Sequence, residues 1–397
     1  MQKSLIKAAS RTGLVNEYYF SAKLAEIARM RLQGADVINL GIGSPDMAPA
    51  QEVTEELSRS ASMAGNHGYQ GYRGIPSLRQ AFAEWYKRFF GVTLDPATEI
   101  LPLMGSKEGI MHVSMAFLDP GDEVLVPDPG YPAYSAAALL AGGKVRTYDL
   151  SEETGWMPDI RAIEAMGVER VKMMWINYPH MPTGAKASVE LFEQLVRFAE
   201  RNHILLCNDN PYSFILNRDH LSILSVPGAR ETALELNSLS KSHNMAGWRI
   251  GMLAGDSGYI NAVLKVKSNM DSGMFQPLQA AAAVALALPE SWYEGLNEAY
   301  LRRRLLAAEI MSSLSCTFRE AQSGLFLWGR IPEERKDSEE LTEELLHGSH
   351  LFVTPGSVFG KNGRRYIRIS LCADEEMLAR ALSRVRSGAI TNKLLTV

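Results

Sequence analysis

Short apolar runs alternate with longer stretches of helical periodicity from residue 100 onward. Short apolar runs bounded by turn residues are typical of buried strands, and the stretches between them are long enough for helices that cross over a sheet. Strands joined by helical crossovers form a mostly parallel sheet with helices on both faces, so the sequence predicts an α/β fold. The candidate strands span residues 100–104, 123–126, 145–149, 171–176, 204–208 and 232–236.

Residues with chemically useful side chains follow most of these strands. A glycine, a serine and a lysine follow the first strand at 105–107, and Tyr131 follows the second in a loop fixed by prolines. Asn177 follows the fourth strand and Asp209 follows the fifth. Ligands of parallel sheets bind at the carboxyl ends of the strands. We therefore expect these side chains to share one site.

The last candidate strand delivers Lys241 into a patch of hydroxyl side chains. Ser238 and Ser240 precede it, and Arg249 opens a second apolar run at 250–254, so the chain turns back and brings Arg249 near Lys241. A lysine amine forms a Schiff base with an aldehyde, while arginine and hydroxyl groups hold a phosphate. Together these residues favour a binding site for an aldehyde cofactor that carries a phosphate. The alternative interpretation is a strand that ends in an exposed lysine.

Gly105, Ser106 and Lys107 open a helix that we expect to reach about residue 118. The start of a helix has free N–H groups and the positive end of the helix dipole, and here it also has a serine hydroxyl. These groups converge on one point, so we assign a phosphate to these residues.

Composition and charge exclude several classes of protein. The 397 residues allow two domains, and a net charge of −4 opposes general nucleic-acid binding. The three cysteines lie far apart and give neither a disulfide framework nor a zinc site, which fits a reducing cytoplasm. Residues 1–11 lack the apolar core of a signal peptide, and the apolar window 277–289 is too short to span a bilayer. We expect a soluble cytoplasmic protein that binds no metal, no nucleic acid and no membrane.

The residues around Lys241 resemble a family signature. Ser238 to Lys241 matches Ser-x-Ser-Lys, and Gly247 to Gly251 matches Gly-x-Arg-x-Gly, both of class I/II aminotransferases. These are pyridoxal 5′-phosphate enzymes of the aspartate aminotransferase fold (fold type I). The resemblance runs from about Asn39 to about Cys372, with the motifs in the family's order.

The resemblance implies a domain organisation. We expect an α/β fold with a large, mostly parallel sheet domain, helices on both of its faces, and a smaller α+β C-terminal domain. The expected parts are an N-terminal segment at 1–46 that packs with the small domain, a large cofactor-binding domain at 47–290, and a small domain with its connecting helix at 291–397. Within that helix, the run Arg302-Arg303-Arg304 is expected to be a solvated face.

The resemblance also assigns roles around the cofactor ring. Tyr131 matches the aromatic residue that stacks on the ring. Asp209 matches the carboxylate that binds the pyridine nitrogen and keeps it protonated, so that the ring accepts electrons from the substrate. Tyr212 matches the tyrosine bonded to the ring oxygen. Lys241 forms the Schiff base and relays the proton.

Residues 177–184 hold the main departure from the family. The family usually reads Asn-x-Pro-x-Asn-Pro-Thr-Gly, and its second asparagine bonds the ring oxygen, but this chain has Met181 there. A thioether is a weak acceptor and cannot donate. One hypothesis is that the Schiff base titrates at higher pH than in relatives that keep the asparagine, unless Asn177, His180 or a water replaces the missing donor. The alternative is that the loop repacks without chemical consequence.

Three more residues take their expected roles from the resemblance. Tyr69 matches a tyrosine that reaches into the neighbouring subunit to touch the cofactor phosphate, which implies a homodimer with shared active sites. Gly43 matches a glycine near the substrate carboxylate. Arg368 matches the arginine that holds the substrate α-carboxylate bidentately. Without the resemblance, Arg368 would be predicted to lie on an exposed strand face.

The implied activity is transfer of an amino group from an L-amino acid to a 2-oxo acid by a ping-pong mechanism. A lyase that performs β-elimination on the same scaffold is the alternative. A cofactor-sensing regulator is more distant, because it needs a DNA-binding module before the first motif and the stretch there is short. Aspartate, alanine and diaminopimelate-like substrates all stay open, with Arg73 as one candidate for a second carboxylate.

Overall fold

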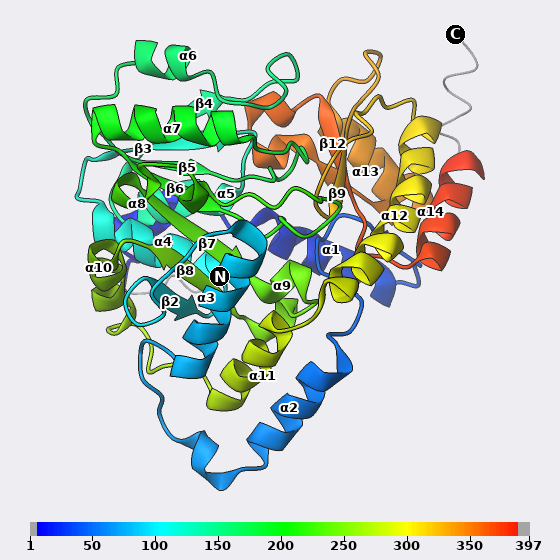
Figure 1. Ribbon diagram of the computed structural model, residues 1–397. Coiled ribbons are helices and arrows are strands. Elements are labelled where there is room, and N and C mark those ends of the chain that lie inside the picture. The colour runs from blue at the N-terminus through cyan, green and yellow to red at the C-terminus, as the bar shows by residue number, and fades with distance from the viewer. Residues whose placement is uncertain (1–5, 388–397) are drawn as a thin grey trace.

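A seven-stranded sheet forms the centre of the computed structural model, which describes residues 6–387 (Figure 1). Its strand order is β2-β8-β7-β6-β5-β3-β4, and only β8 runs antiparallel to its neighbours. The predicted mostly parallel sheet is therefore confirmed. The strands are β2 Ile100–Leu103, β3 Glu123–Asp128, β4 Lys144–Asp149, β5 Val171–Ile176, β6 Leu205–Asp209, β7 Ala233–Ser238 and β8 Gly251–Gly255.

Helices cover both faces of this sheet, so its inner strands are apolar on both sides. In β6, Leu205 and Cys207 pack with one buried cluster and Leu206 packs with the other, because successive side chains point to opposite faces. The cluster around Cys207 is completed by α4 Ser106–Phe117, α5 Pro132–Leu140 and α10 Ser257–Lys267. The opposite cluster includes side chains of α3 Pro76–Phe90, α6 Ile160–Ala165, α7 Val189–Asn202 and α11 Gln276–Leu286.

A second, antiparallel sheet of order β11-β12-β9 lies in the C-terminal part of the chain. Its strands are β9 Phe326–Arg330, β11 Thr354–Pro355 and β12 Tyr366–Ser370, and the helices there are α12 Glu290–Ser313, α13 Ser338–Ser349 and α14 Glu375–Ser387. The strand β10 Leu351–Phe352, just before β11, is not part of this sheet and pairs with another partner.

The N-terminal segment is joined to this C-terminal part. After α1 Tyr19–Leu32, the short strand β1 Ile38–Asn39 pairs in parallel with β10. The predicted domain boundaries, 1–46, 47–290 and 291–397, stay predictions, and residues 1–5 and 388–397 lie outside the described residues.

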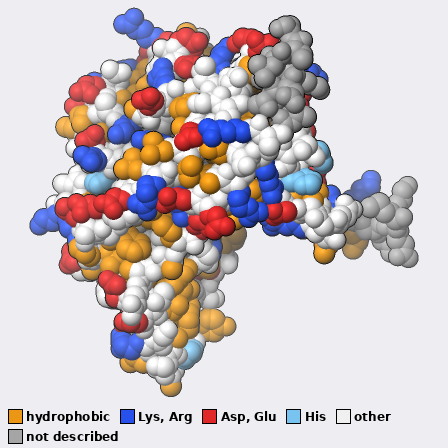
Figure 2. All heavy atoms as spheres, turned by 90° about the vertical axis from the view of Figure 1, so that its right-hand side faces the viewer, with side chains coloured by type: hydrophobic (Ala, Val, Ile, Leu, Met, Phe, Trp, Pro, Cys, Tyr) orange, Lys and Arg blue, Asp and Glu red, His pale blue; other side chains and the backbone are white. Residues whose placement is uncertain are grey.

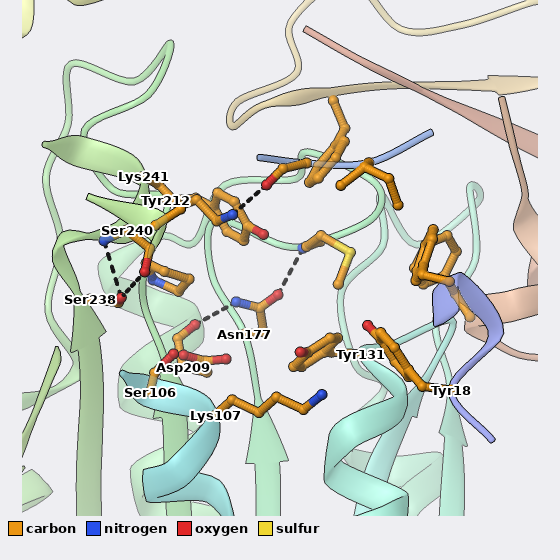
Figure 3. Close-up of a pocket in the computed structure, with 18 of the residues that line it drawn as sticks. Tyr18, Ser106, Lys107, Tyr131, Asn177, Asp209, Tyr212, Ser238, Ser240 and Lys241 are labelled. Atoms are coloured by element: carbon orange, nitrogen blue, oxygen red, sulfur yellow. Dashed lines mark hydrogen bonds between the residues drawn. The ribbon is translucent and has the colours of Figure 1, made fainter. Parts of the chain in front are cut away.

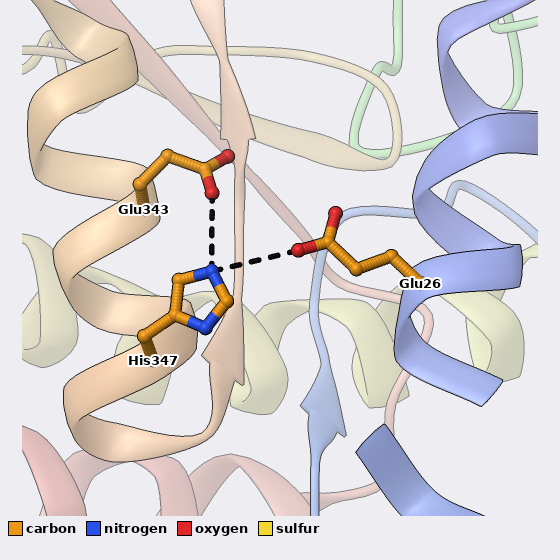
Figure 4. Close-up of side chains that lie close together, drawn as sticks. All are labelled: Glu26, Glu343 and His347. Atoms are coloured by element: carbon orange, nitrogen blue, oxygen red, sulfur yellow. Dashed lines mark ion pairs between the residues drawn. The ribbon is translucent and has the colours of Figure 1, made fainter. Parts of the chain in front are cut away.

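Charged side chains also connect α1 to α13. His347 Nε2 lies 3.5 Å from Glu26 Oε1 and 3.4 Å from Glu343 Oε2 (Figure 4). Lys23 of α1 contacts both carboxylates as well. These contacts hold the N-terminal segment against the C-terminal part, which places the residues around the start of α1 beside the central cavity.

The helix α2 Gln51–Ala61 was not anticipated from the sequence. It packs along α11, and together they form an arm that projects from the body of the molecule (Figure 1). Hydrophobic side chains gather on the projecting lower part of the surface (Figure 2). Within residues 6–387, no helix combines the length and apolar character needed to cross a bilayer.

The prediction that Arg302-Arg303-Arg304 forms a solvated face is wrong for the middle residue. Arg303 is buried and makes a two-pronged ion pair with Asp46, with Nη1–Oδ1 and Nη2–Oδ2 distances of 2.6 and 2.9 Å. Successive residues of a helix point about 100° apart. Arg302 therefore reaches outward to Glu375, while Arg303 reaches inward and ties the N-terminal segment to α12.

Candidate active site

A cavity of about 630 Å³ lies at the carboxyl ends of the parallel strands, between the large sheet, the N-terminal segment and the C-terminal part (Figure 3). Most of the site residues predicted from the sequence line this one cavity. They are Gly43, Ser106, Lys107, Tyr131, Asn177, Met181, Asp209, Tyr212, Ser238, Ser240, Lys241, Arg249 and Arg368.

Lys241 is presented by α9 Leu239–Ser242, a short helix directly after β7. The Ser238 hydroxyl caps this helix by accepting from the Ser240 N–H, at 3.2 Å. The Lys241 amine donates to the Gly43 carbonyl (Figure 3) and has no acidic partner among the described residues. Removal from water lowers its pKa, with Arg368 and Arg249 acting in the same direction. An amine with a lowered pKa is more often unprotonated, so it can act as a nucleophile or a base.

Arg249 lies against the start of α4 and forms an anion-binding corner. Its Nη1 donates to the Ala246 carbonyl at 2.8 Å and lies 3.4 Å from Ser240 Oγ. A Cβ atom at Gly105 would lie only 2.1 Å from Arg249 Nη2, so glycine is required for this close approach. Gly105 also has a φ of +86°, which L side chains rarely adopt. The guanidinium, the hydroxyls and the free N–H groups at Ser106 together fit a phosphate.

The Lys107 side chain points away from this corner. Its amine lies 4.3 Å from the centre of the Tyr18 ring, and Figure 3 shows it directed toward Tyr18 rather than toward Ser106. Burial and then Arg249 lower its pKa. A phosphate contact through the Lys107 backbone at the start of α4 stays a prediction, whereas the amine faces another part of the cavity.

Asp209 is a buried carboxylate with one oxygen open. Its Oδ2 accepts from the Tyr134 hydroxyl at 2.9 Å, and its Oδ1 has no hydrogen-bond partner among the described residues. Burial raises its pKa to about 7, although the hydrogen bond from Tyr134 opposes the shift. A buried acceptor needs a donor, and a protonated pyridine nitrogen would satisfy Oδ1. The residue therefore fits the cofactor that the sequence predicts.

Asn177 and His180 make other contacts, and His180, whose Nε2 has no hydrogen-bond partner among the described residues, does not line the cavity. The Asn177 amide donates to the Asp209 carbonyl, and its oxygen accepts from the Met181 N–H at 2.8 Å (Figure 3). His180 is buried with Nδ1 2.7 Å from Thr183 Oγ1. Tyr212 remains as a side-chain donor at this side of the cavity, and burial raises its pKa, so the hydroxyl keeps its proton.

Arg368 is buried without a carboxylate partner among the described residues. Its Nη2 donates to the Gly41 carbonyl at 2.8 Å, and its guanidinium carbon lies 3.8 Å from the Phe326 ring centre and 4.6 Å from that of Phe359. Burial lowers its pKa to about 10, so it remains charged at neutral pH. A buried cation without a partner favours binding of an anion, and a substrate carboxylate is such an anion.

Several lining residues were not predicted. Tyr18 and Phe20 reach the cavity from the N-terminal segment, Phe326 and Phe359 from the C-terminal part, and Tyr134 from α5. For Tyr134 the sequence held one local signal: it follows Tyr131 by three residues at the start of a helix, so it lies one turn further along the same helix. Tyr69, in contrast, is 93% exposed and does not line the cavity of its own chain.

Comparison with known proteins places these features in one family. Residues 35–385 match the sequence profile described as aminotransferase class I and II. The LL-diaminopimelate aminotransferase of Desulforudis audaxviator is 41% identical over 380 residues, which cover 95% of this chain and 97% of the relative. That of Aquifex aeolicus is 41% identical over 357 residues, which cover 89% and 92%.

Solved structures agree with these sequence relatives. Substrate-bound BacF from Bacillus subtilis has a TM-score of 0.93 and 32% identity, covering 96% of this chain and 98% of that chain. The aspartate aminotransferase of Thermus thermophilus with maleate has a TM-score of 0.89 and 30% identity, covering 96% and 99%. Both sequence relatives are aminotransferases, so the lyase alternative gains no support.

Proposed function

Because the chain belongs to the class I and II aminotransferase family, we propose that the residues of its central cavity bind pyridoxal 5′-phosphate and one amino-acid substrate. Enzymes of this family depend on that cofactor, and the protein is an aminotransferase that moves an amino group from an amino acid to a 2-oxo acid. The observation that carries the residue assignment is that two groups converge on one cavity: the Lys241 amine, which has no acidic partner among the described residues, and Asp209 Oδ1, which has no hydrogen-bond partner among them.

The proposed cofactor-binding groups surround this cavity. When bound, the cofactor supplies an aldehyde carbon that takes up the amino group and a ring that accepts electrons from the substrate. Arg249, Ser106, Ser238, Ser240 and the start of α4 would hold the phosphate, Asp209 would hold the ring nitrogen and Tyr131 would cover the ring face. Tyr212 would donate to the ring oxygen. The full set is Gly105, Ser106, Lys107, Tyr131, Asn177, Met181, Asp209, Tyr212, Ser238, Ser240, Lys241 and Arg249, with Tyr69 from a second subunit.

Lys241 is proposed to bind the cofactor aldehyde and to move the proton. Its lowered pKa favours the unprotonated amine relative to a lysine in water, and an unprotonated amine can accept the proton from the substrate α-carbon and return it. Asp209 stays ionised beside a cationic partner, because an adjacent positive charge favours the charged carboxylate. Arg368 fixes the substrate carboxylate, which fixes the α-carbon relative to Lys241.

The substrate is proposed to be an amino acid with a second carboxylate at its far end, and LL-diaminopimelate is the first candidate. The relatives from Desulforudis audaxviator and Aquifex aeolicus have this substrate in their name. Lys107 supports the assignment, because its amine lines the cavity beside Tyr18 and has no acidic partner among residues 6–387. Arg73 does not line the cavity of its own chain, since its guanidinium contacts Asn261 and the Ala97 carbonyl.

We expect a panel of amino donors to give the highest kcat/KM with LL-diaminopimelate. Replacing Lys107 by methionine should lower kcat/KM for this donor about 10- to 100-fold, because a charge-assisted hydrogen bond contributes about 1.5–3 kcal/mol. The same variant should change kcat/KM for alanine less than about threefold, since alanine has no distal carboxylate. Lys87→Met, on the exposed end of α3, is the matched control. Equal losses for both donors would contradict the proposed role of Lys107.

A homodimer is proposed from the exposed aromatic and methionine side chains near Tyr69. Tyr69, Met270 and Phe275 are 93%, 65% and 41% exposed. The loops that carry these side chains lie together. Gly273 packs so closely against the Gln70 backbone that an added Cβ atom at Gly273 would lie only 2.4 Å from the Gln70 carbonyl oxygen. Contiguous exposed apolar surface marks interaction sites.

Sedimentation velocity is expected to give twice the chain mass of 43.9 kDa, and Tyr69→Ala is expected to lower cofactor affinity. The loss should be about three- to tenfold, the effect of one hydrogen bond. A monomer with full activity and unchanged cofactor affinity in Tyr69→Ala would rule out shared active sites.

A cytoplasmic location is proposed from the cysteines. Cys207 and Cys316 are buried and free, and Cys372 is free as well. Free thiols are typical of proteins in reducing compartments. Fractionation of the source cells tests the proposal, and recovery outside the cytoplasmic fraction would contradict it.

A further inference from the structure

The Met181 sulfur lies against Arg368. Arg368 Nη1 is 3.2 Å from Met181 Sδ, and both side chains are buried, with 4% and 6% exposed. Met181 is the position at which the chain departs from the family pattern. Among the described residues, the hydrogen-bond partner of its sulfur is therefore the arginine proposed to hold the substrate carboxylate, rather than a group on the ring-oxygen side.

The guanidinium of Arg368 is fixed in two different ways. The Phe326 and Phe359 rings pack against it, with centre distances of 3.8 and 4.6 Å, and such packing restrains the tilt of its plane. Packing against rings does not stop rotation within that plane. The two lateral contacts, Nη1 to the Met181 sulfur and Nη2 to the Gly41 carbonyl at 2.8 Å, supply that restraint.

These lateral contacts leave Arg368 able to bind a carboxylate. A guanidinium has five N–H donors, and the sulfur and the carbonyl use one each. The Nε–H has no partner among the described residues, and each Nη keeps a second hydrogen. A thioether is also a weak, uncharged acceptor, so it orients the cation without neutralising it.

We propose that Met181 is a positioning residue for Arg368, whose thioether sets the in-plane orientation of the guanidinium before the substrate arrives. The proposal rests on the proposed function, in which Arg368 binds the substrate α-carboxylate. It deepens that function by giving a role to the one cavity residue at which the family pattern is broken.

The local backbone makes this role testable by substitution. The Met181 N–H donates to Asn177 Oδ1 at 2.8 Å, and this contact does not involve the Met181 side chain. Side-chain variants at 181 therefore keep the anchor that holds the loop. Leucine fills a similar volume but has no acceptor, whereas glutamine has a similar length and restores an acceptor.

The test measures carboxylate binding to the holoenzyme by isothermal titration calorimetry. The probe is pimelate, a seven-carbon dicarboxylate that lacks the amino and oxo groups and does not react. Met181→Leu is expected to raise the Kd of pimelate about three- to tenfold, the effect of one hydrogen bond to a weak, uncharged acceptor. Met181→Gln should stay within about twofold of the parent protein. Met166→Leu, at an exposed methionine outside the cavity, is the matched control.

Steady-state kinetics add a readout that a general packing defect would not give. In Met181→Leu, KM for the amino donor and KM for the oxo acceptor should rise by the same factor while kcat stays within about twofold, because both substrates carry the α-carboxylate. An unchanged Kd and KM in Met181→Leu, or equal weakening in the leucine and glutamine variants, would overturn the proposal. Arg368→Met separates the role of Met181 from the role of Arg368. If the Arg368→Met variant binds pimelate as well as the parent protein does, Arg368 does not bind the carboxylate, and the proposed function is wrong at this residue.

Discussion

Replacing Lys241 by alanine is expected to lower kcat for amino transfer at least about a thousandfold. The variant loses the amine that is proposed to bind the cofactor aldehyde and to carry the substrate proton. Loss of a positioned general base alone reduces rates about 10²- to 10⁴-fold, and loss of a covalent attachment adds to that. The measurement is kcat with LL-diaminopimelate and a 2-oxo acid at saturating substrate.

Two controls separate this effect from misfolding. The Lys241 amine makes one contact, to the Gly43 carbonyl, and no ion pair among the described residues, so the cofactor-free variant should unfold at nearly the temperature of the parent. Added methylamine should restore part of the lost rate, because a small amine fits the space left by the side chain. A variant with kcat within tenfold of the parent would contradict the role of Lys241.

Replacing Arg368 by methionine is expected to lower kcat/KM for every amino donor about 10²- to 10³-fold without lowering stability. Truncating one partner of a buried charge pair reduces binding by about 2–5 kcal/mol. In the free protein, however, the Arg368 charge is buried with no carboxylate partner among residues 6–387. An unpaired buried charge destabilises the fold. The free energy of unfolding of the cofactor-free protein, measured in urea, should therefore stay the same or rise.

Arg365 provides the matched control, three residues before Arg368. Its guanidinium donates to backbone carbonyls, including that of Pro332 at 2.6 Å, and it does not line the cavity. Arg365→Met should lower the free energy of unfolding by about 1–3 kcal/mol, because those carbonyls lose their donor. Its kcat/KM should stay within about threefold of the parent. If Arg368→Met loses stability while keeping kcat/KM, the carboxylate-binding role is wrong.

The sequence was sufficient to predict the large sheet, because the sequence patterns that indicate its strands are local. Each strand is a short apolar run with a turn at its end, and several candidate residues, such as Asp209, follow such a run directly. Parallel strands place their carboxyl ends at one edge. The sequence therefore predicted both the sheet and the convergence of most cavity residues.

The aromatic residues that reach the cavity from distant parts of the chain were not predicted. Phe20 and Phe326 sit in a helix and a strand, where an aromatic residue is usually part of the core. Phe20 lines the cavity because β1 pairs with β10 and draws the N-terminal segment over the site, whereas Phe326 lines it from β9 of the C-terminal sheet. The direction of the Lys107 amine and the burial of Arg303 depend in the same way on partners, Tyr18 and Asp46, that are remote in sequence.

The most direct test of the central claim is to locate the cofactor on the chain. The holoenzyme is reduced with borohydride, digested and analysed by peptide mass spectrometry, which reports the lysine that carries the reduced cofactor. The added mass is predicted to lie on the peptide containing Lys241, and prior incubation with an amino donor is predicted to abolish it. Attachment to another lysine, such as Lys107, would contradict the role assigned to Lys241.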